Sequence, residues 1–178
     1  MCYNTLNEEK TEENGMTREE WRARLRFREM GAGDEERMRD FFGRMSPASR
    51  ALFDRRSYNL RGALKFCEKG DPTRRYWLAL EGEELVGYVF FLDVDTSIPE
   101  LGLAVREDLQ GQHLGEALID YATEVARALG KGGIQLTTHV ANLRGQVLYE
   151  KMGFVCRGSC KNGSELFYLY RFSETGKR

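Results

Sequence analysis

The stretch with the strongest chemical signal runs from Val105 to Leu118, where an apolar, strand-like run passes through a short glycine-containing loop into a helix. The first four N–H groups of a helix have no partner within it, and the helix dipole favours negative charge at that end. A junction of this kind can therefore bind a pyrophosphate. Gly111 and Gly115 would let the backbone approach a ligand or a strand closely. The alternative is an ordinary turn in which both glycines only relieve crowding.

A second candidate segment runs from Asn142 to Phe154. Asn142 and Tyr149 are seven positions apart, which is about two helical turns and places both side chains on one face of a helix. Both could therefore contact one ligand. Structural roles are equally open at this point, because Asn is a favoured helix cap and a Tyr beside Leu148 can serve in packing.

The histidines and cysteines offer no metal site by their spacing. No pair of cysteines has the short spacing typical of zinc ligands, and His113 and His139 are not a helical pair. We therefore expect no metal and reduced, scattered thiols. His139, at the end of a predicted strand, is a weak catalytic candidate, because a lone His is more often structural.

Length, composition and charge narrow the class of protein. The chain has 178 residues, with 27 Lys and Arg against 28 Asp and Glu and a formal net charge of -1. These values describe one soluble globular domain that can bury its own core without a disulfide framework. The longest apolar run, 85–92, is too short to span a membrane, and no signal peptide is recognisable. We expect a cytoplasmic protein with no membrane partner and no nucleic-acid partner, since a nucleic-acid binder would show a basic excess.

Hydrophobic periodicity predicts the elements that must position these residues. Residues 1–20 are acidic and poor in apolar side chains, so we expect a mobile leader followed by a single domain over 21–178. Strands are expected over 22–28, 76–80, 85–92, 101–105, 134–138, 154–160 and 166–171, and helices over 34–45, from 46 onward, over 112–129 and over 142–152. The prediction of the first strand rests on the alternation of Arg with apolar residues, and Asp34 is an expected helix cap. The order predicts a mixed sheet with helices on both faces.

Together, in this order, the two segments resemble the GCN5-related N-acetyltransferase (GNAT) superfamily over about residues 22–172. The family's loop, which reads Gln or Arg, any, any, Gly, any, Gly or Ala, is matched by Gln110 and Gly115, while His113 stands where the middle Gly is usual. Since the family's contact there is a backbone amide, we expect His113 to substitute with a negative φ and an outward side chain. The later segment is similar to Asn-x-x-Ala-x-x-Leu-Tyr-x-Lys-x-Gly-Phe, with Gly145 in place of the Ala.

The resemblance implies a fold and a binding site. The fold would be α/β (α+β), with a mixed, mostly antiparallel sheet of about six to seven strands splayed between the fourth and the fifth. Acetyl-CoA would lie in that opening as co-substrate, its pantetheine arm along the fourth strand and its pyrophosphate on the following loop. The cofactor-binding residues so implied are Leu103, Ala104, Val105, Gln110, Gly111, Gln112, His113, Leu114, Gly115, Glu116, Asn142 and Tyr149.

The same resemblance implies direct attack of an amine on the thioester in a ternary complex. Tyr149 would lie near the sulfur and protonate the departing thiolate. An amine of pKa about 10 must first lose a proton, and Glu100 stands where related enzymes often carry a carboxylate. Asp93 and Asp95, on the preceding loop, could join Glu100 in attracting a cationic amine. A merely solvated acidic loop is the alternative.

The sequence leaves two classes of acceptor open, a small-molecule amine and a protein lysine. It also leaves open whether the chain forms a homodimer. A weaker likeness to the acetyltransferase domain of bacterial protein lysine acetyltransferases rests on common residue types around Phe27, Asp34 and Phe41. Two other functions compete with N-acetyl transfer. One is a non-catalytic acyl-CoA-binding sensor or interaction domain, which the intact Tyr149 disfavours. The other is a nucleic-acid-binding module, which the balanced charge disfavours.

Overall fold

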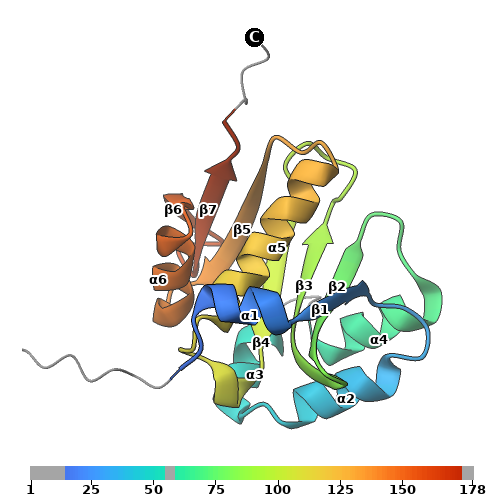
Figure 1. Cartoon of the computed structure of the whole chain (residues 1–178). Coiled ribbons are helices and arrows are strands. Elements are labelled where there is room, and N and C mark those ends of the chain that lie inside the picture. The colour runs from blue at the N-terminus through green and yellow to red at the C-terminus, as the bar shows by residue number, and fades with distance from the viewer. Residues whose placement is uncertain (1–14, 55–58, 174–178) are drawn as a thin grey trace, which may run out of the picture.

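The computed structural model describes residues 15–54 and 59–173 of the chain (Figure 1). Its helices are α1 (Arg18–Arg24), α2 (Glu35–Gly43), α3 (Pro47–Asp54), α4 (Leu60–Lys69), α5 (Leu114–Ala128) and α6 (Leu143–Lys151), with a 3-10 turn η1 (Glu107–Leu109). Its strands are β1 (Arg26–Glu29), β2 (Arg75–Glu81), β3 (Glu84–Leu92), β4 (Glu100–Val105), β5 (Gly133–His139), β6 (Val155–Cys160) and β7 (Glu165–Arg171). Most of the leader expected over 1–20 lies outside the described residues, and α1 begins within its last part.

The strands form one seven-stranded sheet in the order β1-β2-β3-β4-β5-β7-β6. Neighbouring strands are antiparallel except for β4 and β5, which are parallel. Parallel neighbours need a crossover connection, and α5 provides it on one face of the sheet. The mixed, mostly antiparallel sheet expected from the sequence is confirmed.

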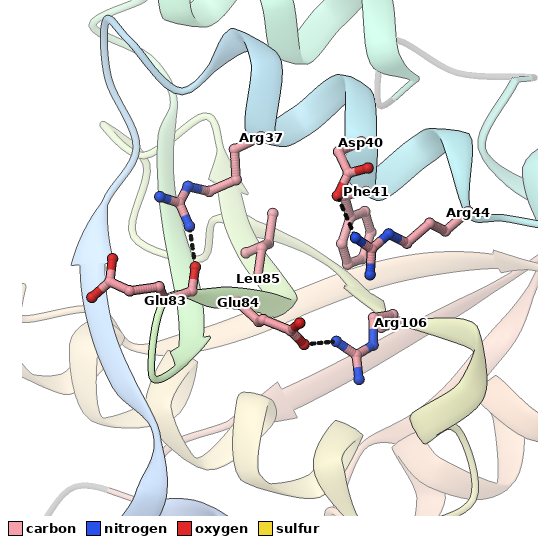
Figure 2. A pocket seen from close by; sticks show the side chains of 8 residues that line it. All are labelled: Arg37, Asp40, Phe41, Arg44, Glu83, Glu84, Leu85 and Arg106. Atoms are coloured by element: carbon pink, nitrogen blue, oxygen red, sulfur yellow. Dashed lines mark hydrogen bonds and ion pairs between the residues drawn. The ribbon is translucent and has the colours of Figure 1, made fainter.

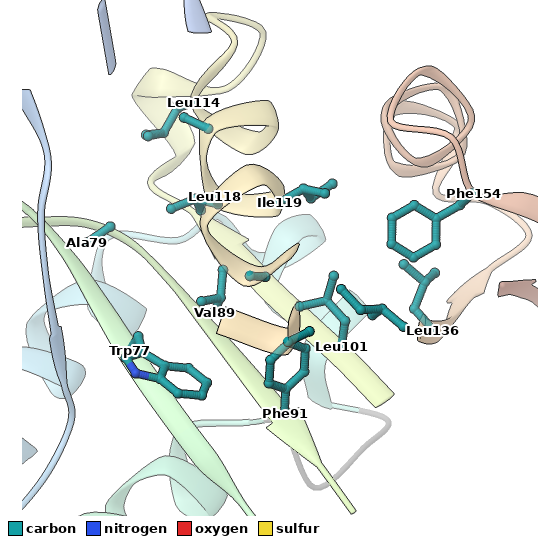
Figure 3. Packing of buried hydrophobic residues seen from close by; sticks show 14 of the residues in the cluster. Trp77, Ala79, Val89, Phe91, Leu101, Leu114, Leu118, Ile119, Leu136 and Phe154 are labelled. Carbon is teal, nitrogen blue, oxygen red and sulfur yellow. The ribbon is translucent and has the colours of Figure 1, made fainter. Parts of the chain in front are cut away.

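Helices cover both faces of the sheet, and each face has its own apolar core. On one face, Leu114 and Leu118 of α5 point toward the strands (Figure 3), and Trp21 of α1 joins the same cluster. On the other face, Met38 of α2 and Cys67 of α4 pack against the strands. No helix in the described part of the chain is both long and apolar enough to cross a membrane.

The expected strand over 22–28 is wrong in its first half. Helix α1 continues through Arg24, and β1 is confined to Arg26–Glu29. The helix starts with a capping box at Thr17 and buries Trp21 completely. Burial of this side chain and satisfaction of the first amides stabilise the helix, so tertiary contacts override the local alternation of Arg and apolar residues.

Among the described residues, three helices connect β1 to β2, where two were expected. Helix α4 was not predicted, although Asn59 caps its first turn and Gly70, with a φ of 63°, ends it. Asp34 occupies the N-cap position of α2 as expected, but its carboxylate does not cap the helix amides. It accepts hydrogen bonds from the Arg28 guanidinium and from the Gly31 N–H instead.

Candidate functional site

Strands β4 and β5 are adjacent and parallel but pair only where they begin. In the described residues their ladder has one rung, Glu100 opposite Gln135, beside a 3.1 Å bond from the Gln135 N–H to the Pro99 carbonyl. On its other edge β4 pairs with β3 along its whole length. The edge of β4 that faces β5 from Leu101 to Val105 therefore offers backbone groups that a ligand can use. The predicted opening between the fourth and fifth strands is confirmed.

The loop at the wide end of this opening, residues 106–113, leads directly into α5. Gly111 has a φ of 79° and His113 a φ of 61°. The negative φ expected at His113 is therefore wrong, because this residue takes the left-handed conformation that the family's usual glycine favours and that His tolerates better than most residues. The first intrahelical bond runs from the Ala117 N–H to the His113 carbonyl at 3.2 Å. The N–H groups of residues 113–116 precede it, which is the arrangement that binds anions.

The two glycines of this junction meet different needs. A Cβ on Gly115 would lie 2.9 Å from a methyl group of Leu148 on α6 and 3.8 Å from Val105 on β4. Gly115 therefore lets α5 approach both elements closely. Gly111 has open space around it, so its positive φ is what requires glycine there.

An ion pair between a buried carboxylate and a half-exposed lysine ties the start of α5 to α6. The Glu116 side chain, 10% exposed, accepts a hydrogen bond from Lys151 Nζ at 2.6 Å and lies 2.9 Å from Nδ1 of His113. Burial by itself would raise the pKa of Glu116, but the hydrogen bonds with Lys151 and His113 hold it below its ordinary value. This pair could not be predicted from the sequence, because Glu116 and Lys151 lie in separate helices.

Asn142 fixes the start of α6 to strand β5. Its Oδ1 accepts the Gly145 N–H at 3.2 Å, and its Nδ2 donates to the Thr138 hydroxyl at 2.9 Å. A Cβ on Gly145 would lie 2.4 Å from this Nδ2, which explains a glycine at this position in the chain. The capping role is confirmed, and contact with a pantetheine arm stays a prediction.

Tyr149 lies farther along α6, half-buried against the core that includes α5. Its ring centroid is 6.0 Å from that of Phe154 and 5.9 Å from that of Tyr168. The Tyr168 hydroxyl donates to Glu150 at 3.0 Å, and burial together with this bond raises the pKa of Tyr168 to about 12. Packing by Tyr149 is thus confirmed, and proton donation by Tyr149 stays a prediction.

Glu100 lies at the closed end of the opening. The Thr137 hydroxyl on β5 donates to the Glu100 carboxylate at 3.4 Å. Side chains alternate along a strand, so Thr137 and His139 lie on the face opposite Leu136, which packs in the α5 core. Nδ1 of His139 accepts the Ala141 N–H at 3.1 Å, a turn contact of the kind expected for a structural His.

The structure places Asp93 and Asp95 on an exposed loop that leads into β4. This loop is packed against the connection between α5 and β5, where Lys131 Nζ donates to the Thr96 carbonyl at 2.9 Å and the Gly132 N–H donates to a second carbonyl of the loop at 2.9 Å. Both carboxylates therefore lie toward the Glu100 end of β4. Within the described residues no group of three or more His, Cys, Asp or Glu side chains is placed to hold a metal ion.

Two hydrogen bonds that the sequence did not reveal hold the loop from outside. Glu107 accepts the Ser46 N–H at 2.6 Å and so joins the loop to the start of α3. On the other side of the loop, the Trp21 indole N–H donates to the Gln112 carbonyl at 2.6 Å. Helices α1 and α3 are thus both attached to the segment that precedes α5.

A small cavity of about 140 Å³ lies between α2, the β2–β3 hairpin and Arg106 (Figure 2). Arginines and carboxylates line it together. Arg106 donates to Glu84 at 2.7 Å, and Arg44 donates to Asp40 at 2.9 Å. These opposite charges neutralise each other, and the Arg37 guanidinium of α2 donates to the Glu83 carbonyl, which joins α2 to the β2–β3 hairpin.

The sequence matches the acetyltransferase (GNAT) family over residues 34–154. The uncharacterized N-acetyltransferase YvbK of Bacillus subtilis (strain 168) is 31% identical over 91 residues, which are 51% of this chain. The aligned part is only 56% of that relative's own length.

Solved structures share the fold at low sequence identity. The GNAT domain of S. lividans PAT superposes with a TM-score of 0.71 at 19% identity, covering 83% of this chain and 90% of that domain. PaiA N-acetyltransferase from Thermoplasma acidophilum, solved in complex with coenzyme A, gives a TM-score of 0.68 at 18% identity, covering 83% of this chain and 99% of that one.

Proposed function

Because this chain belongs to the acetyltransferase (GNAT) family, we propose that it is an N-acetyltransferase that moves an acetyl group from acetyl-CoA to a primary amine. The observation that carries the proposal is the opening between β4 and β5, with the N-terminus of α5 at its wide end. In the described residues the backbone edge of β4 beyond Glu100 does not pair with β5, so it suits the amide-rich pantetheine arm, and the amides of residues 113–116 suit a pyrophosphate. The CoA complex of a protein with the same fold supports this assignment.

The charges around the loop fit an anionic co-substrate. Arg144 donates to the Gln110 side chain at 3.5 Å, so a guanidinium group lies beside the loop. The Glu116 carboxylate at the start of α5 would oppose a bound anion if it stood alone. Its ion pair with Lys151 neutralises that charge.

The chemistry proposed for the chain's own residues is acid–base and positional. Acetyl-CoA supplies an activated thioester when bound. Tyr149 would donate its hydroxyl proton to the departing sulfur, and Glu100 would accept the proton of the amine directly or through a water. Alignment of the two substrates, with backbone donors of β4 facing the developing oxyanion, would supply most of the rate enhancement.

The acceptor is proposed to be a cationic amine, either a small molecule or a protein lysine. Glu100, Asp93 and Asp95 all lie at one end of β4, where they would favour positive charge. Asp93 and Asp95 are exposed, so their attraction is expected to act mainly on the association of the amine and to weaken at high salt.

Two measurements test this function. Isothermal titration of the full chain with CoA and with acetyl-CoA should give saturable binding, and either ligand should raise the melting temperature. A screen of amines and lysine peptides, read by thiol release from acetyl-CoA, should then find acceptors. Absence of CoA binding would contradict the site itself. Binding without thiol release across the screen would favour the acyl-CoA sensor.

A further inference from the structure

Helix α1 brings a tryptophan against the loop that precedes α5. Trp21 is 0% exposed, and its indole N–H donates to the Gln112 carbonyl at 2.6 Å. This is a short hydrogen bond made by a buried donor, so losing it would leave a polar group without compensation from water. The position of α1 therefore bears directly on the backbone of the loop.

The bond fixes the orientation of one peptide group. In a trans peptide the C=O and the following N–H point in opposite directions. With the Gln112 carbonyl turned toward Trp21, the His113 N–H must point away from α1. That N–H is the first of the amides that precede the helical bonds of α5. His113 itself has a φ of 61°, a left-handed conformation that surrounding contacts must hold in a residue other than glycine.

Helix α1 is itself anchored to α5 and not only to the loop. Arg18 pairs with Asp120 at 3.3 Å, and Arg22 pairs with Glu124 at 2.6 Å. The guanidinium of Arg22 also lies 5.6 Å from the ring centroid of Tyr121 on the same helix. The indole is therefore held in register with the helix whose N-terminus carries the amides.

We propose that Trp21 is a positioning residue for the pyrophosphate of the acyl donor: it orients the Gln112–His113 peptide so that the His113 N–H faces the bound anion. The inference rests on the proposed function and deepens it. Preorganised donors bind an anion more tightly because no reorganisation is needed on binding. Trp21 therefore strengthens the binding of acyl donors that carry a pyrophosphate and has no effect on how the thioester end of the donor is bound.

The test compares two acyl donors in Trp21→Phe. Acetyl-CoA carries the pyrophosphate, whereas S-acetylpantetheine carries the same thioester without it. We expect the variant to bind CoA about tenfold more weakly and to lose about tenfold in kcat/KM for acetyl-CoA, the size of one hydrogen bond. The kcat/KM for S-acetylpantetheine should be the same in the variant and the wild type. Trp77→Phe, which alters the other tryptophan in the same core cluster, is the matched control. It should leave kcat/KM unchanged for both acyl donors.

If Trp21 had a merely structural role, Trp21→Phe would lower kcat/KM for both acyl donors together or would leave the Kd for CoA unchanged. Either result overturns the inference. If the wild-type chain binds no CoA at all, the proposed function fails first and the inference fails with it. A second readout does not depend on the folding of Trp21→Phe. In Trp77→Phe the remaining tryptophan is Trp21, and its emission should change saturably with CoA but not with pantetheine; unchanged emission with CoA contradicts the proposal.

Discussion

The hydroxyl of Thr137 on β5 donates to the carboxylate of Glu100 on β4, 3.4 Å away, beside the one rung at which these two strands pair in the described residues. The bond spans the closed end of the opening. A group in this position can accept a proton from an amine that enters on the face opposite α5. The relationship also separates the two ends of the site, since the loop before α5 lies at the other end of β4.

Glu100→Gln should depress the acetylation rate most at neutral pH. The variant keeps the size and the bond with Thr137 but cannot accept a proton, so its rate should recover as the amine loses its own proton near its pKa of about 10. The observable is the pH profile of kcat/KM for the two proteins. A uniform loss at every pH would mean that Glu100 binds the cationic amine or supports β4.

Tyr149→Phe should lower turnover by about 10²-fold while leaving the Kd for CoA nearly unchanged. The ring would still pack against Phe154, and only the hydroxyl donor to the leaving sulfur would be lost. Tyr168→Phe is the matched control, because its hydroxyl bonds to Glu150. Equal turnover of the wild type and Tyr149→Phe, with chemistry rate-limiting, would reduce Tyr149 to its packing role.

Much of the fold could be predicted because each local signal agrees with the tertiary structure. The apolar stripe of α5 ends at Gly130, which has a φ of 69°, and the β6–β7 hairpin turns at Asn162 and Gly163, both with positive φ. The opening between β4 and β5 was predicted from a family resemblance and not from periodicity. Strand pattern alone does not show that two parallel strands separate after one rung.

The features that the sequence did not predict correctly have a common physical origin: they depend on contacts between residues that are far apart along the chain. Trp21 belongs to a helix because it is buried against α5 and hydrogen-bonded to Gln112. The local alternation of Arg with apolar residues does not indicate these contacts. The φ of His113 is likewise set by the junction and not by the residue type. The ion pair of Glu116 with Lys151 joins two motifs that were found separately, but their contact appears only when α5 and α6 pack together.

Asn142→Ala should lower the free energy of unfolding by about 1 kcal/mol, the usual cost of losing an N-cap. Asn142→Asp should lower it much less, because a carboxylate still accepts the Gly145 N–H and suits the helix N-terminus. Urea unfolding at neutral pH measures both. Equal destabilisation by Ala and Asp would show that the bond to Thr138, and not the cap, is the important contact.

Lys151→Met should destabilise the protein in a pH-dependent way, because Glu116 is the acidic partner. The pKa of Glu116 is lowered in the folded protein, so the stability it contributes is present above its ordinary pKa of 4.5 and is lost as the pH falls through the folded value. Without Lys151 one of the two hydrogen bonds that lower the pKa of Glu116 is lost, so this pKa should rise.

The expected difference in free energy of unfolding between the wild type and Lys151→Met is therefore about 1 to 2 kcal/mol near pH 7, discounted because Lys151 is half exposed. It should shrink as the pH falls from the raised pKa of Glu116 in Lys151→Met to its lowered pKa in the folded wild type, because in that range the carboxylate takes up a proton only in the variant. Urea unfolding across this range measures it. In a Glu116→Gln background, which has no carboxylate to titrate, Lys151→Met should have the same small effect at every pH. A pH-dependent effect in that background would assign the titration to a different group.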